Sequence, residues 1–107
     1  MSRNLYTKAE VLLCTYAAIF DVEEFGGLSS IQSLEGRSLS SIKMKISNIA
    51  SMLDEEGVPR KNRVSPLTGL PRGEKGRRTN WAWVQSFYPL NQTSFLSQCR
   101  VAVMLKS

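Results

Sequence analysis

The sequence predicts a mainly α-helical fold: a compact trihelical bundle of the helix-turn-helix or Myb-like kind, extended by a basic loop and one or two C-terminal helices. Two observations predict it. Apolar residues recur at helical spacing in several segments. These segments begin at residues that favour helix N-caps or end at glycine or proline. We expect a single domain, 1–107, with a trihelical core over 6–57, a basic loop over 58–79 and a helical extension over 80–107.

The first two helices are predicted from their ends. Thr7 and Glu10 have the spacing of a capping box, in which each side chain accepts a hydrogen bond from the other's backbone. The helix that follows should run to about residue 20 and bury one apolar stripe. The stripe includes Val11, Leu12, Tyr16 and either Ile19 or Phe20. Ser29 or Ser30 can cap a short second helix, which Gly36 ends.

The third helix, predicted over 37–54, has a polar face that indicates nucleic-acid recognition. Ser38 can cap it, and Gly57 and Pro59 follow its end. Its core stripe contains Leu39, Ile42, Ile46, Ile49, Ala50 and Leu53. The opposite face carries Ser40, Ser41, Met44, Lys45, Asn48 and Ser51, with Lys43 at the margin. Solvated helix faces usually mix glutamates with lysines, whereas this helix has no acidic residue before Asp54. Because it carries no negative charge there, this face can lie against phosphates and base edges without repulsion.

The positive charge of the chain is concentrated in the loop that follows. From 59 to 78, seven basic residues oppose Glu74, so 7 − 1 = +6, while the other 87 residues sum to 7 − 8 = −1. The seven are Arg60, Lys61, Arg63, Arg72, Lys75, Arg77 and Arg78. Frequent proline and glycine predict an irregular loop. We expect it to contact phosphates beside the third helix. The alternative is a flexible solubilising linker.

Two further helices are expected after the loop. Thr79 or Asn80 can cap a helix over 81–88 that ends before Pro89. Its five large apolar and aromatic residues should complete the core, although a stacking platform for unpaired bases is the alternative. Thr93 can cap a last helix, while CRVAVML also alternates well enough for a strand. We favour the helix.

The composition argues against catalysis. The chain has no histidine, which excludes Ser-His and Cys-His nucleophiles and histidine metal ligands. It also has no glycine-rich nucleotide loop. Asp21, Glu23 and Glu24 could bind a divalent cation, but a solvated helix end is the simpler interpretation. Cys14 and Cys99 are expected to be buried thiols. We therefore expect no enzyme activity, no metal and no cofactor.

The chain is also expected to be cytoplasmic, with no membrane partner. Its start, MSRNLYTKAE, lacks the apolar core and cleavage site of a signal peptide. No run approaches the roughly 20 apolar residues of a membrane span.

One segment carries a resemblance to a known family. The run GRSLSSIKMKISNIASMLD resembles the N-terminal segment of bacterial HNH-type restriction endonucleases. The matching residues are Gly36, Arg37, Ser38, Ser41, Met44, Lys45, Asn48, Ala50, Ser51 and Asp54. The opening Tyr6, Thr7 and Glu10 and the run GLPRGEKGRRTNWAWVQSFY are similar to that family too, so the likeness spans about 6–88. Ile49 replaces a usual Phe, Glu55 stands where Pro often follows, and the HNH domain has no counterpart in these 107 residues.

The resemblance implies a DNA-recognition or targeting module, and the absence of histidine indicates that it does not cut. We therefore predict a non-catalytic module that binds double-stranded DNA, with the third helix as recognition helix and the loop on phosphates. The candidate residues are Arg37, Ser38, Ser40, Ser41, Lys43, Met44, Lys45 and Asn48, together with the seven basic residues of the loop. The alternative is a protein-interaction adapter or inhibitor, of phage or mobile-element origin, with the same fold.

Overall fold

The computed structural model describes residues 5–61 and 80–106, and all of the regular secondary structure in these residues is helical. The elements are α1 (Lys8–Ile19), the 3-10 helix η1 (Val22–Phe25), α2 (Leu28–Glu35), α3 (Leu39–Glu55), α4 (Trp81–Phe87) and α5 (Gln92–Lys106). The predicted mainly α fold is confirmed. None of the helices in the described ranges has the length and apolar character needed to cross a membrane.

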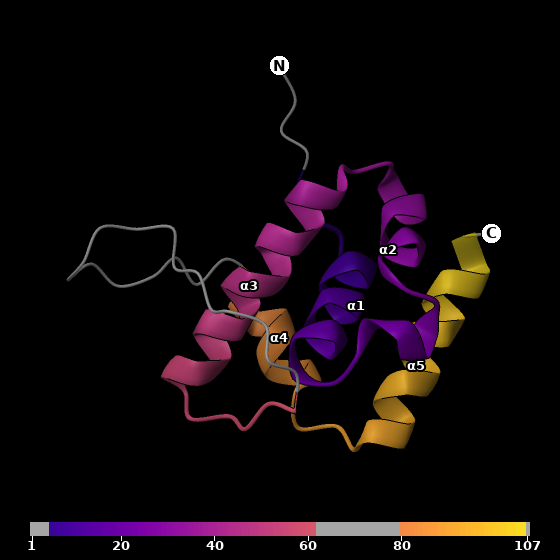
Figure 1. The fold of residues 1–107 in the computed structure, drawn as a ribbon. Helices are drawn as coiled ribbons and strands as arrows, with labels where there is room; N and C mark the ends of the chain where they lie inside the picture. The colour runs from indigo at the N-terminus through magenta and orange to yellow at the C-terminus, as the bar shows by residue number, and fades with distance from the viewer. Residues whose placement is uncertain (1–4, 62–79, 107) are drawn as a thin grey trace.

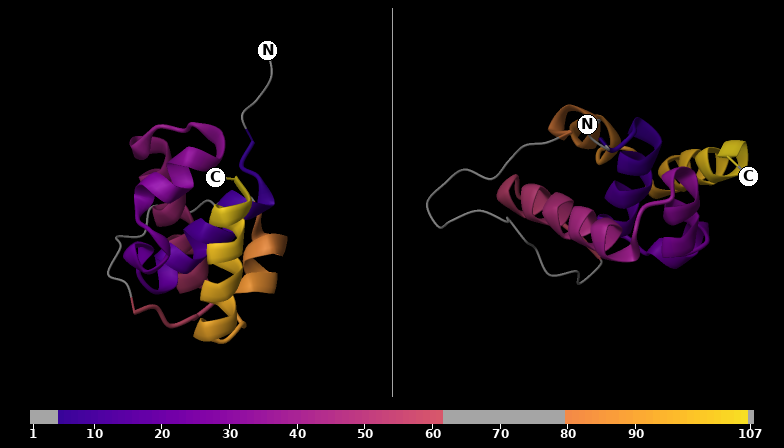
Figure 2. Two further views of the ribbon diagram at one scale, coloured as in Figure 1. Left: turned by 90° about the vertical axis from the view of Figure 1, so that its right-hand side faces the viewer. Right: turned by 90° about the horizontal axis from the view of Figure 1, so that it is seen from above.

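α1 lies at the centre of the bundle. It contacts α3 on one side and α4 and α5 on the other, with α2 packed against α1, α3 and α5 (Figures 1 and 2). Every residue of α1 from Glu10 to Ile19 is buried. The expectation of a single buried stripe on this helix was wrong, because α4 and α5 cover the side that a three-helix core would leave to solvent.

The predicted caps of α1 and α3 are confirmed. Glu10 N donates to Thr7 Oγ1 at 3.2 Å, and Thr7 N donates to Glu10 Oε1 at 2.9 Å, which completes the capping box. The backbone N of Ser41 donates to the Ser38 hydroxyl at 3.1 Å. These local hydrogen bonds satisfy donors that the first turn of a helix leaves unpaired, so both helices begin where the sequence places them.

α2 begins earlier than expected. Its N-cap is Gly27, with φ 89°, and neither Ser29 nor Ser30 caps it. The turn from η1 needs positive φ at Gly26 and Gly27 in succession, which favours glycine and starts the helix directly afterwards. The Ser30 hydroxyl instead donates to the Phe25 carbonyl at 3.4 Å. The left-handed Gly36 ends α2 as predicted.

α4 begins at Trp81 with Asn80 at its N-cap position, as predicted, but Asn80 is left-handed and its side chain makes no cap bond. Thr79 lies outside the described residues. α5 is helical, as we favoured, but Asn91 caps it in place of Thr93: Ser94 N donates to Asn91 Oδ1 at 2.9 Å. Asn91 lies one residue before the helix, where a side-chain oxygen reaches the third helical N–H.

One hydrophobic cluster contains residues from all five helices. α3 contributes Ile42, Ile46, Ile49, Ala50 and Leu53, as predicted, whereas Leu39, at the edge of that stripe in the first turn, is exposed. α4 and α5 contribute Val84, Phe87, Phe95 and Cys99. The C-terminal helices are therefore part of the core and not an addition to it.

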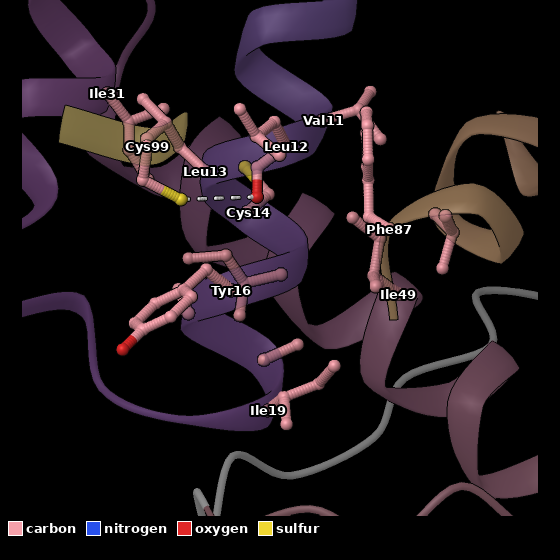
Figure 3. Packing of buried hydrophobic residues seen from close by; sticks show 14 of the residues in the cluster. Val11, Leu12, Leu13, Cys14, Tyr16, Ile19, Ile31, Ile49, Phe87 and Cys99 are labelled. Atoms are coloured by element: carbon pink, nitrogen blue, oxygen red, sulfur yellow. Dashed lines mark hydrogen bonds between the residues drawn. The ribbon is translucent and has the colours of Figure 1, made fainter. Parts of the chain in front are cut away.

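Tyr16 and the two thiols lie inside this core (Figure 3). The Tyr16 ring meets Phe95 edge-on, with centroids 5.1 Å apart, and Phe25 at 5.9 Å. Cys14 and Cys99 are buried and free, as expected. Cys99 Sγ lies 4.0 Å from the Leu12 carbonyl oxygen, a contact that Figure 3 shows as a dashed line.

The buried Cys14 thiol should make stability depend on alkaline pH. Burial, together with nearby Glu10, raises the pKa of Cys14 to about 12. An acid whose folded pKa is raised stabilises the protein below its unfolded pKa and loses that contribution as pH rises toward the folded value. Between about pH 9 and 12 the free energy of unfolding should fall by up to ~1.4 kcal/mol per pH unit from this group. Urea unfolding at several pH values should show a shallower decline for Cys14→Ala; an equal decline contradicts the assignment.

Candidate nucleic-acid interface

The accessible face of α3 is narrower than the sequence predicts. Ser40, Lys43 and Met44 are exposed, Met44 to 56%. Ser47, one turn later, is half-buried and belongs to the same side of the helix. This position was not among the predicted site residues, although its spacing of four from Lys43 could have indicated it. The exposed strip thus covers about two turns and contains no acidic side chain.

Lys45, predicted on the polar face, is buried. Only 8% of it is exposed, and its ammonium donates to Asn80 Oδ1 at 2.7 Å. The same nitrogen lies 5.2 Å from the centre of the Tyr6 ring. Burial lowers the pKa of Lys45. The expectation that Lys45 lies on the open polar face was wrong, because the start of α4 and the Tyr6 ring enclose this side of α3.

Arg37 is also used inside the protein. Its Nε donates to Glu10 Oε2 and its Nη2 to Glu10 Oε1 at 3.0 Å, and Nη2 also reaches the Leu5 carbonyl at 2.6 Å. Its guanidinium carbon stands 3.9 Å from the centre of the Tyr6 ring. The hydrogen bond to Glu10 raises the pKa of Arg37. Glu10 is fully buried, and a buried carboxylate needs such a partner. Arg37 is therefore engaged within the protein, and its nucleic-acid-binding role stays a prediction.

Tyr6 joins these groups into one polar cluster. Its hydroxyl and the Ser41 Oγ are 2.8 Å apart, and burial raises the pKa of Tyr6. Ser41 is therefore half-buried and paired within the protein, which corrects its assignment to the open recognition face. We call the set Tyr6, Glu10, Arg37, Ser41, Lys45 and Asn80 the polar cluster. With one carboxylate and two cations it holds a net charge of −1 + 2 = +1.

Asn48 and Ser51 are less accessible than predicted. Asn48 is half-buried, and its Oδ1 is a buried atom without a hydrogen-bond partner within the described residues. Ser51, one turn further, is buried. After Met44, no residue of α3 is exposed until Asp54 in the last turn, so the exposed part of the acid-free polar face lies in the N-terminal half of the helix. Asn48 lies at the border of that open strip, between Met44 and the enclosed side that holds Lys45.

Arg60 and Lys61, at the start of the predicted basic loop, are tied to the bundle. Arg60 forms a bidentate ion pair with Asp54, with Nε–Oδ1 2.8 Å and Nη2–Oδ2 3.0 Å. This hydrogen bond lowers the pKa of Asp54. Arg60 therefore closes the turn after α3, and its predicted contact with phosphate stays a prediction. The backbone N of Lys61 donates to the Ile19 carbonyl at 2.7 Å, and its side chain stays exposed.

The other five basic residues of the predicted loop lie outside the described residues: Arg63, Arg72, Lys75, Arg77 and Arg78. Residues 5–61 and 80–106 contain eight basic and eight acidic side chains, so they sum to zero. The net charge of +5 comes from Arg3 and from 62–79, where five basic residues oppose Glu74. Long-range attraction to a polyanion would therefore depend on 62–79 and not on the described bundle.

The acidic residues near η1 have structural roles. Asp21 Oδ1 accepts from Glu23 N at 3.0 Å and caps η1. Glu24 Oε1 accepts from the Tyr16 hydroxyl at 3.0 Å, and burial raises the pKa of Tyr16 to about 12. Across the described parts of the chain, no group of three or more Cys, Asp or Glu side chains is placed to hold a metal ion.

Comparison with protein families, curated proteins and solved structures gives no significant match for this chain. The resemblance to HNH-type restriction endonucleases therefore stays a prediction from the sequence motif. Within that motif, Arg37 and Lys45 belong to the polar cluster, while Met44 lies on the accessible strip.

Arg37→Ala should destabilise the fold. It leaves the Glu10 carboxylate buried without its cation, which costs about 3–5 kcal/mol for a broken buried pair. Lys43→Ala, in the same helix but exposed, is the matched control and should change the free energy of unfolding by less than about 0.5 kcal/mol. Urea denaturation at pH 7 measures both. Equal stability of the two variants would show that the Glu10–Arg37 pair does not support the fold.

Proposed function

We propose that the protein is a non-catalytic, cytoplasmic nucleic-acid-binding module that contacts double-stranded DNA through the exposed N-terminal half of α3. The observation that carries this proposal is the accessible strip of Ser40, Lys43, Met44 and Ser47, which combines hydroxyl, ammonium and thioether groups without any acid. In this proposal, Arg37 and Lys45 hold the strip in place through their hydrogen bonds to Glu10 and Asn80 inside the polar cluster.

The strip suits a duplex groove in size and chemistry. Residues 40 to 47 extend about 10 Å along the helix axis, and the major groove is about 12 Å wide. Serine hydroxyls can bond to phosphate or base edges, Lys43 to phosphate or guanine, and Met44 can contact a thymine methyl. The N-terminus of α3 at exposed Ser38 adds free backbone donors and the positive end of the helix dipole.

Affinity and specificity would then come from different parts of the chain. The described bundle is electrically neutral, so the general attraction to phosphates is assigned to the five basic residues within 62–79. Base reading is assigned to the α3 strip, whose side chains project from a rigid helix. In this division the basic residues carry little sequence information.

A protein-interaction adapter or inhibitor is the second candidate. The observation that favours it is the exposure of Leu39 and Met44 on the same part of α3. Apolar side chains on an otherwise neutral body are also typical of a protein-binding surface.

A salt titration separates the two candidates. If about five phosphates are neutralised, log affinity for random duplex DNA should fall against log salt with a slope near roughly −4.5. Fluorescence anisotropy with a labelled duplex measures this slope. No measurable binding at about 50 mM salt, where phosphate contacts are strong, favours the adapter.

Two variants test the division of roles. Arg77→Ala combined with Arg78→Ala should weaken binding to all duplexes similarly and flatten the salt slope by about two. Met44→Ala should weaken binding only to a preferred duplex selected from a random pool, by about 5- to 150-fold, the equivalent of about 1–3 kcal/mol. Thermal unfolding confirms that both variants fold. A Met44→Ala protein with unchanged preference contradicts the reading role of α3.

A further inference from the structure

The side chain of Lys45 is a buried cation that has no acidic partner within the described residues. Its ammonium carries three N–H groups, and in the described part of the chain Asn80 Oδ1 accepts one of them, at 2.7 Å. The centre of the Tyr6 ring, 5.2 Å away, offers a weaker contact. The nearby Glu10 carboxylate is already bound by the Arg37 guanidinium. The positive charge of the polar cluster is therefore left uncompensated, which is costly in a buried position.

Two further polar groups without partners lie beside this ammonium. Asn48 follows Lys45 by three residues on α3 and lies over the same turn, because helical side chains lean toward the helix N-terminus. Its Oδ1 is buried and accepts no hydrogen bond from any described residue. The Asn80 amide nitrogen, next to the oxygen that Lys45 contacts, donates to no described residue. Free donors of Lys45 and Asn80 and a free acceptor of Asn48 are thus gathered at the start of α4.

We propose that these groups form a binding site for inorganic phosphate. Two requirements select this ligand. The charge of the polar cluster requires an anion, whose oxygens accept hydrogen bonds from Lys45 and Asn80. The Asn48 carbonyl oxygen requires a donor, which the P–O–H group of a hydrogen phosphate supplies. The site is independent of the function proposed for the α3 strip.

The same chemistry rejects the groups that most resemble inorganic phosphate. Sulfate at neutral pH has no hydrogen, so it would set an oxygen lone pair against Asn48 Oδ1. A phosphate monoester loses its last hydrogen near about pH 6, and a phosphodiester of the DNA backbone has none to offer. A water molecule can bond to both Lys45 and Asn48, but it leaves the charge without a counterion.

The site has room for a small ligand that enters from solvent. Lys45 is 8% exposed, whereas Asn48 and Asn80 are half-buried and keep part of their surface in solvent. A phosphate bound there would contact α3 and the residue that starts α4. Because the unfolded chain does not bring these residues together, binding should stabilise the folded state.

Thermal unfolding of the full chain at about pH 7.5 tests the identity of the ligand. For a Kd of about 1 mM, phosphate at about 10 mM should raise Tm by about 5 °C. Sulfate and methyl phosphate at the same ionic strength should each raise it by less than about 1 °C. Equal shifts with all three anions indicate a general salt effect, and no shift with phosphate indicates that water suffices. Either result overturns the proposal.

Removing the cation tests the location of the site. Lys45→Met should abolish the shift that phosphate causes, because the anion loses its counter-charge. Lys43→Met is the matched control: it is the same change at an exposed position of α3, and the shift should persist. A shift that persists in Lys45→Met places the bound phosphate elsewhere and overturns the assignment.

An internal carboxylate gives a second, independent test. Asn48→Asp sets an anion beside the Lys45 ammonium, so it should raise Tm without phosphate and abolish the further shift with it. Asn91→Asp is the control, because it keeps an acceptor for the cap of α5 and lies outside the site; its shift with phosphate should persist. Circular dichroism confirms which variants fold, and either site variant decides the question. A lower Tm for Asn48→Asp, or an unchanged shift with phosphate, contradicts the site.

Discussion

The buried ion pair between Glu10 and Arg37 sets the relation between α1 and α3. Glu10 is both the capping residue of α1 and the partner of Arg37, which directly precedes the cap of α3. The two residues of the pair are 27 positions apart in the sequence. The Tyr6 ring stacks on the Arg37 guanidinium. Because a lone buried carboxylate is costly, the fold keeps this geometry, and the rotation of α3 follows from it.

That rotation decides what α3 can offer to a partner. It turns Lys45 toward Asn80 and Ser41 toward Tyr6. Part of the α3 face that the sequence predicts to be polar and exposed is therefore enclosed by the bundle. Short hydroxyls, one lysine and two apolar residues stay accessible in the first half of the helix. The net positive charge of the sequence and the accessible strip of α3 thus belong to separate segments. Under the proposed function, this division would let general attraction and selective contact vary independently.

The sequence by itself determined the features that depend on neighbours within one helical turn. The Thr7 capping box, the Ser38 cap, the Gly36 stop and the apolar stripe of Ile42 to Leu53 follow from spacings of three and four residues. The tertiary structure decided which polar residues are enclosed. Arg37 and Lys45 find their partners 27 and 35 residues away, and no local pattern records such a contact. A lysine on a polar helix face is exposed or buried according to the helix that packs beside it, and only the assembled bundle fixes that neighbour.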